Sequence, residues 1–131
     1  HSTGLLRDRI LSLGLQDSIS LIGAVSHDGL SNYIQEADAL ILPSYREGVP
    51  NVIMESLASG TPVIVTRVGG IPVIVSSSLN GVFIEDLSAS GVADAIDNIK
   101  NQSWNPALIR QSIHAYTWEN TALRLVKYLC E

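Results

Sequence analysis

Cysteine and basic residues are scarce in this sequence. Cys130, next to the last position, is the only cysteine among 131 residues, so an internal disulfide is excluded and a reducing compartment fits best. Lys and Arg total 8 against 13 acidic residues, which gives a formal net charge of -5. Because the basic residues do not cluster, neither nucleic acid nor an anionic membrane is expected as the main partner.

Long apolar runs are absent as well. No run approaches the roughly 20 residues that span a bilayer, and the opening HSTG is unlike a signal peptide. We expect a cytoplasmic location, with peripheral membrane attachment as the alternative for a longer protein. His1 in place of Met indicates that the chain begins inside such a longer protein.

Several cofactor and metal motifs are also missing. No G-x-G-x-x-G follows a predicted strand, and neither G-K-[ST] nor Asp-x-Asp occurs, which disfavours dinucleotide and ATPase functions. His1, His27 and His114 are scattered without the spacing of metal ligands. We predict no metal site and no cofactor, and we assign His27 to the N-terminal cap of a helix.

What the sequence does contain is a regular alternation of apolar runs and helical patterns. The predicted strands are residues 18–23, 39–44, 62–66 and 81–85. The predicted helices are residues 4–15, 26–37, 51–59, 87–100, a segment from Pro106, and 117–129. This alternation is typical of parallel strands buried on both faces. At this length it predicts one α/β domain, a doubly wound parallel sheet with helices on both faces.

The loop after residues 39–44 carries the candidate chemistry, because ligands bind at the carboxyl ends of parallel strands. Glu47 lies in that loop and Glu55 lies inside the next helix, with the free amides of Asn51 and Val52 between them. Such amides bind anions, and the flanking carboxylates suit sugar hydroxyls. Exposed glutamates near a helix start are also common dipole and capping features, so both interpretations remain open.

The segment EGVPNVIMESLASGTPVIVTRVGGIP, residues 47–72, closely resembles the signature of the retaining nucleotide-sugar glycosyltransferases of family four (group 1), which have the GT-B fold. The likeness includes two glutamates separated by seven residues, the SG-PV step and the GG-P loop. A weaker likeness runs from Leu5 to Tyr128. The resemblance implies that residues 1–131 form a single partial domain, the Rossmann-like C-terminal half of a GT-B enzyme, truncated at its N-terminus.

The resemblance also implies roles for individual residues. Glu47, the expected catalytic residue, would contact the donor sugar, and Glu55 would contact the ribose. The expected donor site comprises Glu47, Gly48, Val49, Pro50, Asn51, Val52, Glu55, Gly69 and Gly70. Within it, the Asn51 and Val52 amides would bind the diphosphate, and the two later glycines would adjoin the sugar.

The resemblance further implies that a sugar is transferred from a nucleoside-diphosphate sugar without a metal ion. Uridine is the provisional base of that donor. The acceptor would be a carbohydrate or lipid-linked molecule bound by the missing N-terminal domain.

Two departures support an alternative, a non-catalytic nucleotide-sugar-binding or regulatory paralogue. Val73 stands where the family has a glutamate, and the Arg and Lys of an earlier family loop are absent. A receiver domain is disfavoured because its acidic cluster and late lysine are missing.

Two groups of apolar and aromatic residues are assigned to packing. Residues 73–75 are expected to pack more deeply than in relatives. Trp104, Trp118 and Tyr128 occur at helical spacing near the domain edge and are predicted to pack rather than to stack on a ligand.

A sheet that lacks its first strands leaves backbone groups and apolar surface uncovered. We therefore expect the isolated chain to self-associate. Light scattering over a wide concentration range checks this prediction, and a stable monomer throughout that range would contradict it.

Overall fold

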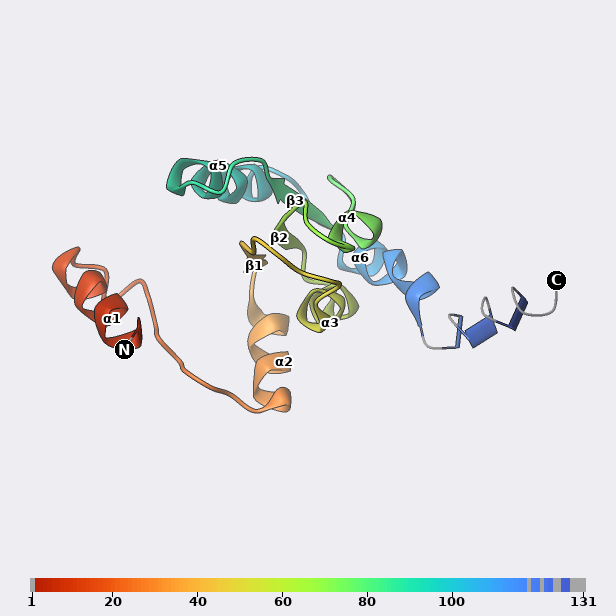
Figure 1. Cartoon of the computed structure of the whole chain (residues 1–131), viewed down its shortest axis with the longest axis horizontal. Coiled ribbons are helices and arrows are strands. Elements are labelled where there is room, and N and C mark those ends of the chain that lie inside the picture. The colour runs from red at the N-terminus through yellow and green to blue at the C-terminus, as the bar shows by residue number, and fades with distance from the viewer. Residues whose placement is uncertain (1, 118, 121, 124–125, 128–131) are drawn as a thin grey trace.

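The computed structural model describes residues 2–117, 119–120, 122–123 and 126–127 (Figure 1). The elements are α1 (Ser2–Ser12), α2 (His27–Glu36), β1 (Leu40–Leu42), α3 (Asn51–Ser59), β2 (Val63–Thr66), α4 (Ile71–Ile74), β3 (Gly81–Ile84), α5 (Ala89–Lys100), α6 (Pro106–Ser112) and the 3₁₀ helix η1 (His114–Tyr116). None of the described helices is long and apolar enough to cross a membrane.

In the described part of the chain, β1, β2 and β3 form a parallel sheet in that order. Leu40 pairs with Val63, and Val63 pairs with Gly81. All residues of β2 and β3 are buried, as expected for parallel strands covered on both faces. The α/β class, the parallel pairing and three of the predicted strands are confirmed.

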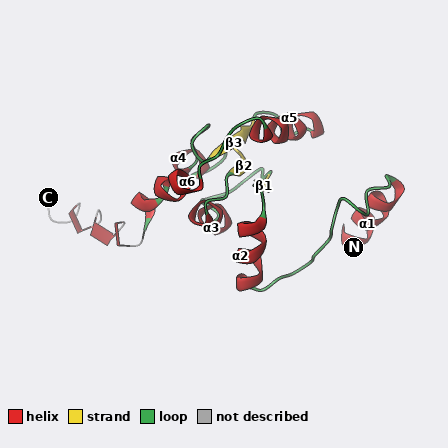
Figure 2. Ribbon diagram, turned by 180° about the vertical axis from the view of Figure 1, so that it is seen from behind, coloured by secondary structure: helices red, strands yellow, loops and turns green. Residues whose placement is uncertain are grey.

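Alternate residues of the central strand β2 face opposite sides of the sheet. Val63 and Val65 join a core cluster with residues of α3, α4 and α6, whereas Ile64 joins a second cluster with residues of α5. Figure 2 shows α3 and α5 on opposite sides of the strands. Each such buried side chain contributes about 1.5–3 kcal/mol. Helices therefore cover both faces, as predicted.

The strand predicted over residues 18–23 is wrong. Ile19 and Ile22 are 42% and 50% exposed, and this segment takes no part in the sheet. The amides of Ser18 and Ile19 donate instead to the carbonyl of Leu15, in a turn that follows α1. Residues 20–23 line a small cavity with residues of α1. Both overall views show α1 standing apart from the sheet (Figures 1 and 2).

Residues 73–75 pack only in part as predicted. Ile74 and Val75 are buried, but Val73 is 69% exposed. Because residues 71–74 form a helical turn, neighbouring side chains point in different directions, and Val73 falls on the outer side. The depth predicted for Val73 is therefore wrong.

The structure describes one of the three aromatic residues that are predicted to pack. Trp104 packs against both core clusters and donates its Nε1–H to the carbonyl of Ile99 at 2.8 Å, so its predicted packing role is confirmed. Trp118 and Tyr128 lie outside the described residues, as do Cys130 and much of the helix predicted over 117–129.

Candidate functional site

Glu47 lies in the loop after β1, and two successive hydrogen bonds through Ser44 link its carboxylate to the end of β2. The Ser44 hydroxyl donates to Glu47 Oε1 at 2.7 Å, and the Thr66 hydroxyl donates to the Ser44 carbonyl at 2.6 Å. Thr66 is the last residue of β2, so the end of the central strand fixes the residue that orients the carboxylate. Glu47 itself is half-buried.

The glycine pair after β2 lies directly against the Glu47 loop. The Gly70 amide donates to the Gly48 carbonyl at 2.8 Å. Gly69 has φ +55°, and a Cβ there would overlap the Glu47 carbonyl. A Cβ at Gly70 would overlap the Val49 side chain. The close approach that requires glycine here is therefore between two loops of the chain.

The start of α3 differs from the starts of α2, α5 and α6. Ser26, Ser88 and Asn105 cap α2, α5 and α6 by accepting hydrogen bonds from backbone amides. Pro50 precedes α3 and has no side chain that can do so. Asn51, the first residue of α3, is exposed. The first amides of α3 therefore remain available to an anion, which the helix dipole also favours.

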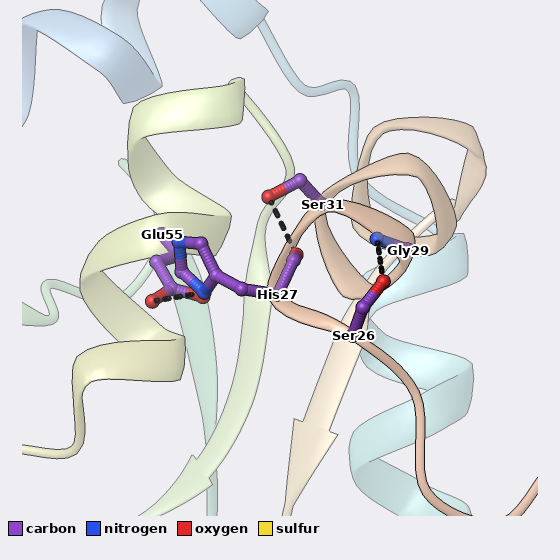
Figure 3. Close-up of polar contacts among 5 residues, drawn as sticks. All are labelled: Ser26, His27, Gly29, Ser31 and Glu55. Carbon is purple, nitrogen blue, oxygen red and sulfur yellow. Dashed lines mark hydrogen bonds and ion pairs between the residues drawn. The ribbon is translucent and has the colours of Figure 1, made fainter.

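Glu55 lies one turn after Asn51 on α3, with its side chain 30% exposed. Figure 3 shows the His27 imidazole beside it, with Nδ1 3.8 Å from Glu55 Oε1. His27 is the first residue of α2, and α2 packs against α3. His27 lies in the cap region of α2, as predicted, and Ser26 is the cap itself. The nearness of His27 to Glu55 was missed, because spacing along the chain carries no signal of that contact.

A cavity of about 430 Å³ brings together several of the predicted residues. Its lining comprises Val49, Asn51, Met54, Gly70, Val73, Ile74 and Tyr116. A larger cavity of about 650 Å³ includes Gly60, Pro62 and Trp104 and lies at the amino end of β2. We favour the smaller cavity as part of the site, because parallel sheets of this kind bind ligands at the carboxyl ends of their strands.

No group of three His, Cys, Asp or Glu side chains in the described residues is arranged to hold a metal ion. The polar groups that the site offers are the two carboxylates and the His27 imidazole, together with the partial positive charge at the start of α3. This combination suits a ligand that carries both hydroxyl groups and a negative charge.

Comparison with known proteins identifies the family. The profile described as "Glycosyl transferases group 1" matches residues 4–116, and the chain belongs to this family. It is 33% identical over 115 residues to the D-inositol 3-phosphate glycosyltransferase of Mycobacterium leprae, covering 83% of this chain and 27% of that protein. It is 27% identical over 126 residues to an uncharacterised glycosyltransferase of Methanocaldococcus jannaschii, covering 92% and 32%.

The fold has a counterpart among solved structures. Sucrose-phosphate synthase from Thermosynechococcus elongatus superposes with a TM-score of 0.75 at 28% identity, covering 95% of this chain and 32% of that one. The chain is therefore a Rossmann-like part of a GT-B fold, as the resemblance implied. It spans about a third of the length of the relatives it matches.

The contact between the two loops predicts the effect of replacing Gly69. Gly69→Ala adds a side chain at positive φ, at about 1–2 kcal/mol, and forces the Glu47 backbone to move, at about 1–3 kcal/mol more. The matched control is Gly48→Ala, where a Cβ meets nothing within 4 Å. Urea unfolding of both variants measures the difference, and equal stabilities would show that the loops do not depend on each other.

Proposed function

We propose that this chain is the donor-binding half of a retaining glycosyltransferase, which transfers a sugar from a nucleoside-diphosphate sugar to an acceptor. The observation that carries the proposal is the uncapped start of α3 at the carboxyl edge of the sheet. It follows the loop of Glu47 and precedes Glu55 by one turn. The match to group 1 glycosyl transferases supports the same function.

The proposed chemistry is electrostatic. In the reaction the bond between the sugar anomeric carbon and the diphosphate oxygen breaks, and negative charge develops on the leaving diphosphate. The anomeric carbon forms a bond to the oxygen of an acceptor hydroxyl, whose proton passes to the leaving diphosphate. The amides of Asn51 and Val52 would stabilise that charge, as preorganised donors do without a metal ion. Glu47 would hold sugar hydroxyls, and Glu55 would accept hydrogen bonds from the ribose.

The glycines and the loop between the carboxylates complete the proposed donor site. Gly48, Val49 and Pro50 set the path of the chain from Glu47 into α3. The Gly70 amide supports that path through its hydrogen bond to the Gly48 carbonyl. Gly69 and Gly70 would adjoin the sugar. Uridine diphosphate is the first nucleotide to test.

The acceptor would bind outside this chain, since the relatives are about three times as long. We propose a carbohydrate or lipid-linked acceptor held by another domain of the full-length protein. The location proposed for that protein is cytoplasmic, with peripheral membrane attachment as the alternative.

A non-catalytic paralogue that binds a nucleotide sugar is the second candidate. The exposed Val73 favours it, because an acid normally follows the glycine pair in the family motif and Val73 cannot replace its charge. Turnover of a nucleotide-sugar panel by the full-length protein separates the two candidates. Binding without transfer or hydrolysis would favour the paralogue.

The two glutamates are expected to differ in their effects in the full-length protein. Glu47→Gln should lower kcat by up to about a hundredfold while nucleotide binding survives, because the sugar loses its position. Glu55→Ala should weaken binding of uridine diphosphate roughly ten- to a hundredfold, since a charged hydrogen bond contributes about 1.5–3 kcal/mol. Steady-state kinetics and calorimetry measure the two effects.

Asp94→Asn on α5 is the matched control, because it removes an exposed carboxylate from the opposite side of the sheet. Asp94→Asn should change neither kcat nor the affinity for uridine diphosphate. If both glutamate variants also left turnover and nucleotide affinity unchanged, the carboxylates would be ordinary charges near a helix start and the proposed site would be rejected.

A further inference from the structure

His27 and Glu55 form a contact between two helices at the proposed site. The imidazole Nδ1 lies 3.8 Å from Glu55 Oε1, and the two side chains are 74% and 30% exposed (Figure 3). A second contact between a basic and an acidic side chain in the described residues joins Arg67 to Glu85. Glu47 has a hydroxyl partner from its own loop, whereas Glu55 has a partner from a separate helix.

The backbone of His27 is fixed by its neighbours. The Ser26 hydroxyl accepts a hydrogen bond from the Gly29 amide at 3.1 Å and thereby caps α2. The Ser31 hydroxyl donates to the His27 carbonyl at 3.3 Å. Figure 3 shows these two contacts on one side of His27 and Glu55 on the other. Because α2 also packs against α3, the backbone of His27 is held beside the helix that carries Glu55.

Stability does not account for this contact. A pair this exposed adds little to folding, and 3.8 Å exceeds the length of a hydrogen bond. The cap of α2 is supplied by Ser26 and needs no imidazole at the next position. What the imidazole does provide is a donor beside one oxygen of a carboxylate that remains accessible to a ligand.

We infer that His27 is a positioning residue for the nucleoside end of the donor site. Its imidazole Nδ1 closes from 3.8 Å to a hydrogen bond with Oε1 of Glu55 when the nucleotide binds, and the carboxylate is thereby turned to accept hydrogen bonds from the vicinal hydroxyls of a ribose. This inference rests on the proposed function, because it assigns the ribose to Glu55. It adds a residue from α2 to a site otherwise made by the loops after β1 and β2 and by α3.

The test is calorimetry of the full-length protein with uridine diphosphate and with its 2′,3′-dideoxy analogue. His27→Ala should weaken uridine diphosphate binding about three- to tenfold and leave the dideoxy analogue nearly unchanged, so that the preference for ribose falls by the same factor. The ratio of the two affinities does not depend on the fraction of folded protein. His27→Asn, whose amide can donate near the position of Nδ1, should restore most of the preference.

Two further variants complete the design. His27→Ala in a Glu55→Ala background should have no additional effect, because the residue to be positioned is gone. His114→Ala removes an exposed histidine from η1 and should leave both affinities unchanged.

The outcomes separate this inference from the proposed function. If Glu55→Ala weakens binding but His27→Ala behaves like His114→Ala, the inference fails and the proposed function stands. Equal weakening of both nucleotides, or additive effects of His27→Ala and Glu55→Ala, would also overturn it. If the unmodified protein binds neither uridine, guanosine nor adenosine diphosphate, or if Glu55→Ala has no effect, the proposed function and the inference fail together.

Discussion

The contact between the loops after β1 and β2 is the constraint on which the site depends. Gly70 donates to the Gly48 carbonyl, and the adjacent Gly69 leaves no room for a side chain against Glu47. The Thr66–Ser44–Glu47 hydrogen bonds add a second link between the same loops. Together these contacts set where the Glu47 carboxylate lies and where α3 begins. The sheet supplies the framework, because both loops leave its carboxyl edge from neighbouring strands.

This arrangement of the two loops sets the position of the start of α3. A serine or an asparagine caps α2, α5 and α6, but α3 follows Pro50 and has no such cap. Its amides therefore offer hydrogen bonds at the carboxyl edge of the sheet. The carboxylates nearby each have one polar partner, Ser44 for Glu47 and His27 for Glu55. A ligand with hydroxyls at both ends and negative charge in the middle fits this order of groups.

The sequence predicted those features that depend on residues close together in the chain. The apolar runs at 39–44, 62–66 and 81–85 and the helix ending at Gly60 are local patterns, and each is confirmed. The run at 18–23 also contains regularly placed apolar residues, but a strand needs a partner as well, and local pattern carries no information on pairing. The same reason explains why the contact between His27 and Glu55, 28 positions apart in the sequence, was missed.

A crystal structure of the full-length protein with a bound nucleoside diphosphate tests the central claim most directly. The account predicts diphosphate oxygens within hydrogen-bond distance of the Asn51 and Val52 amides, with the ribose hydroxyls on Glu55. The loops after β1 and β2 should keep their contact through Gly70 and Gly48. A diphosphate bound at the opposite end of the sheet, in the cavity beside Gly60, would contradict the account.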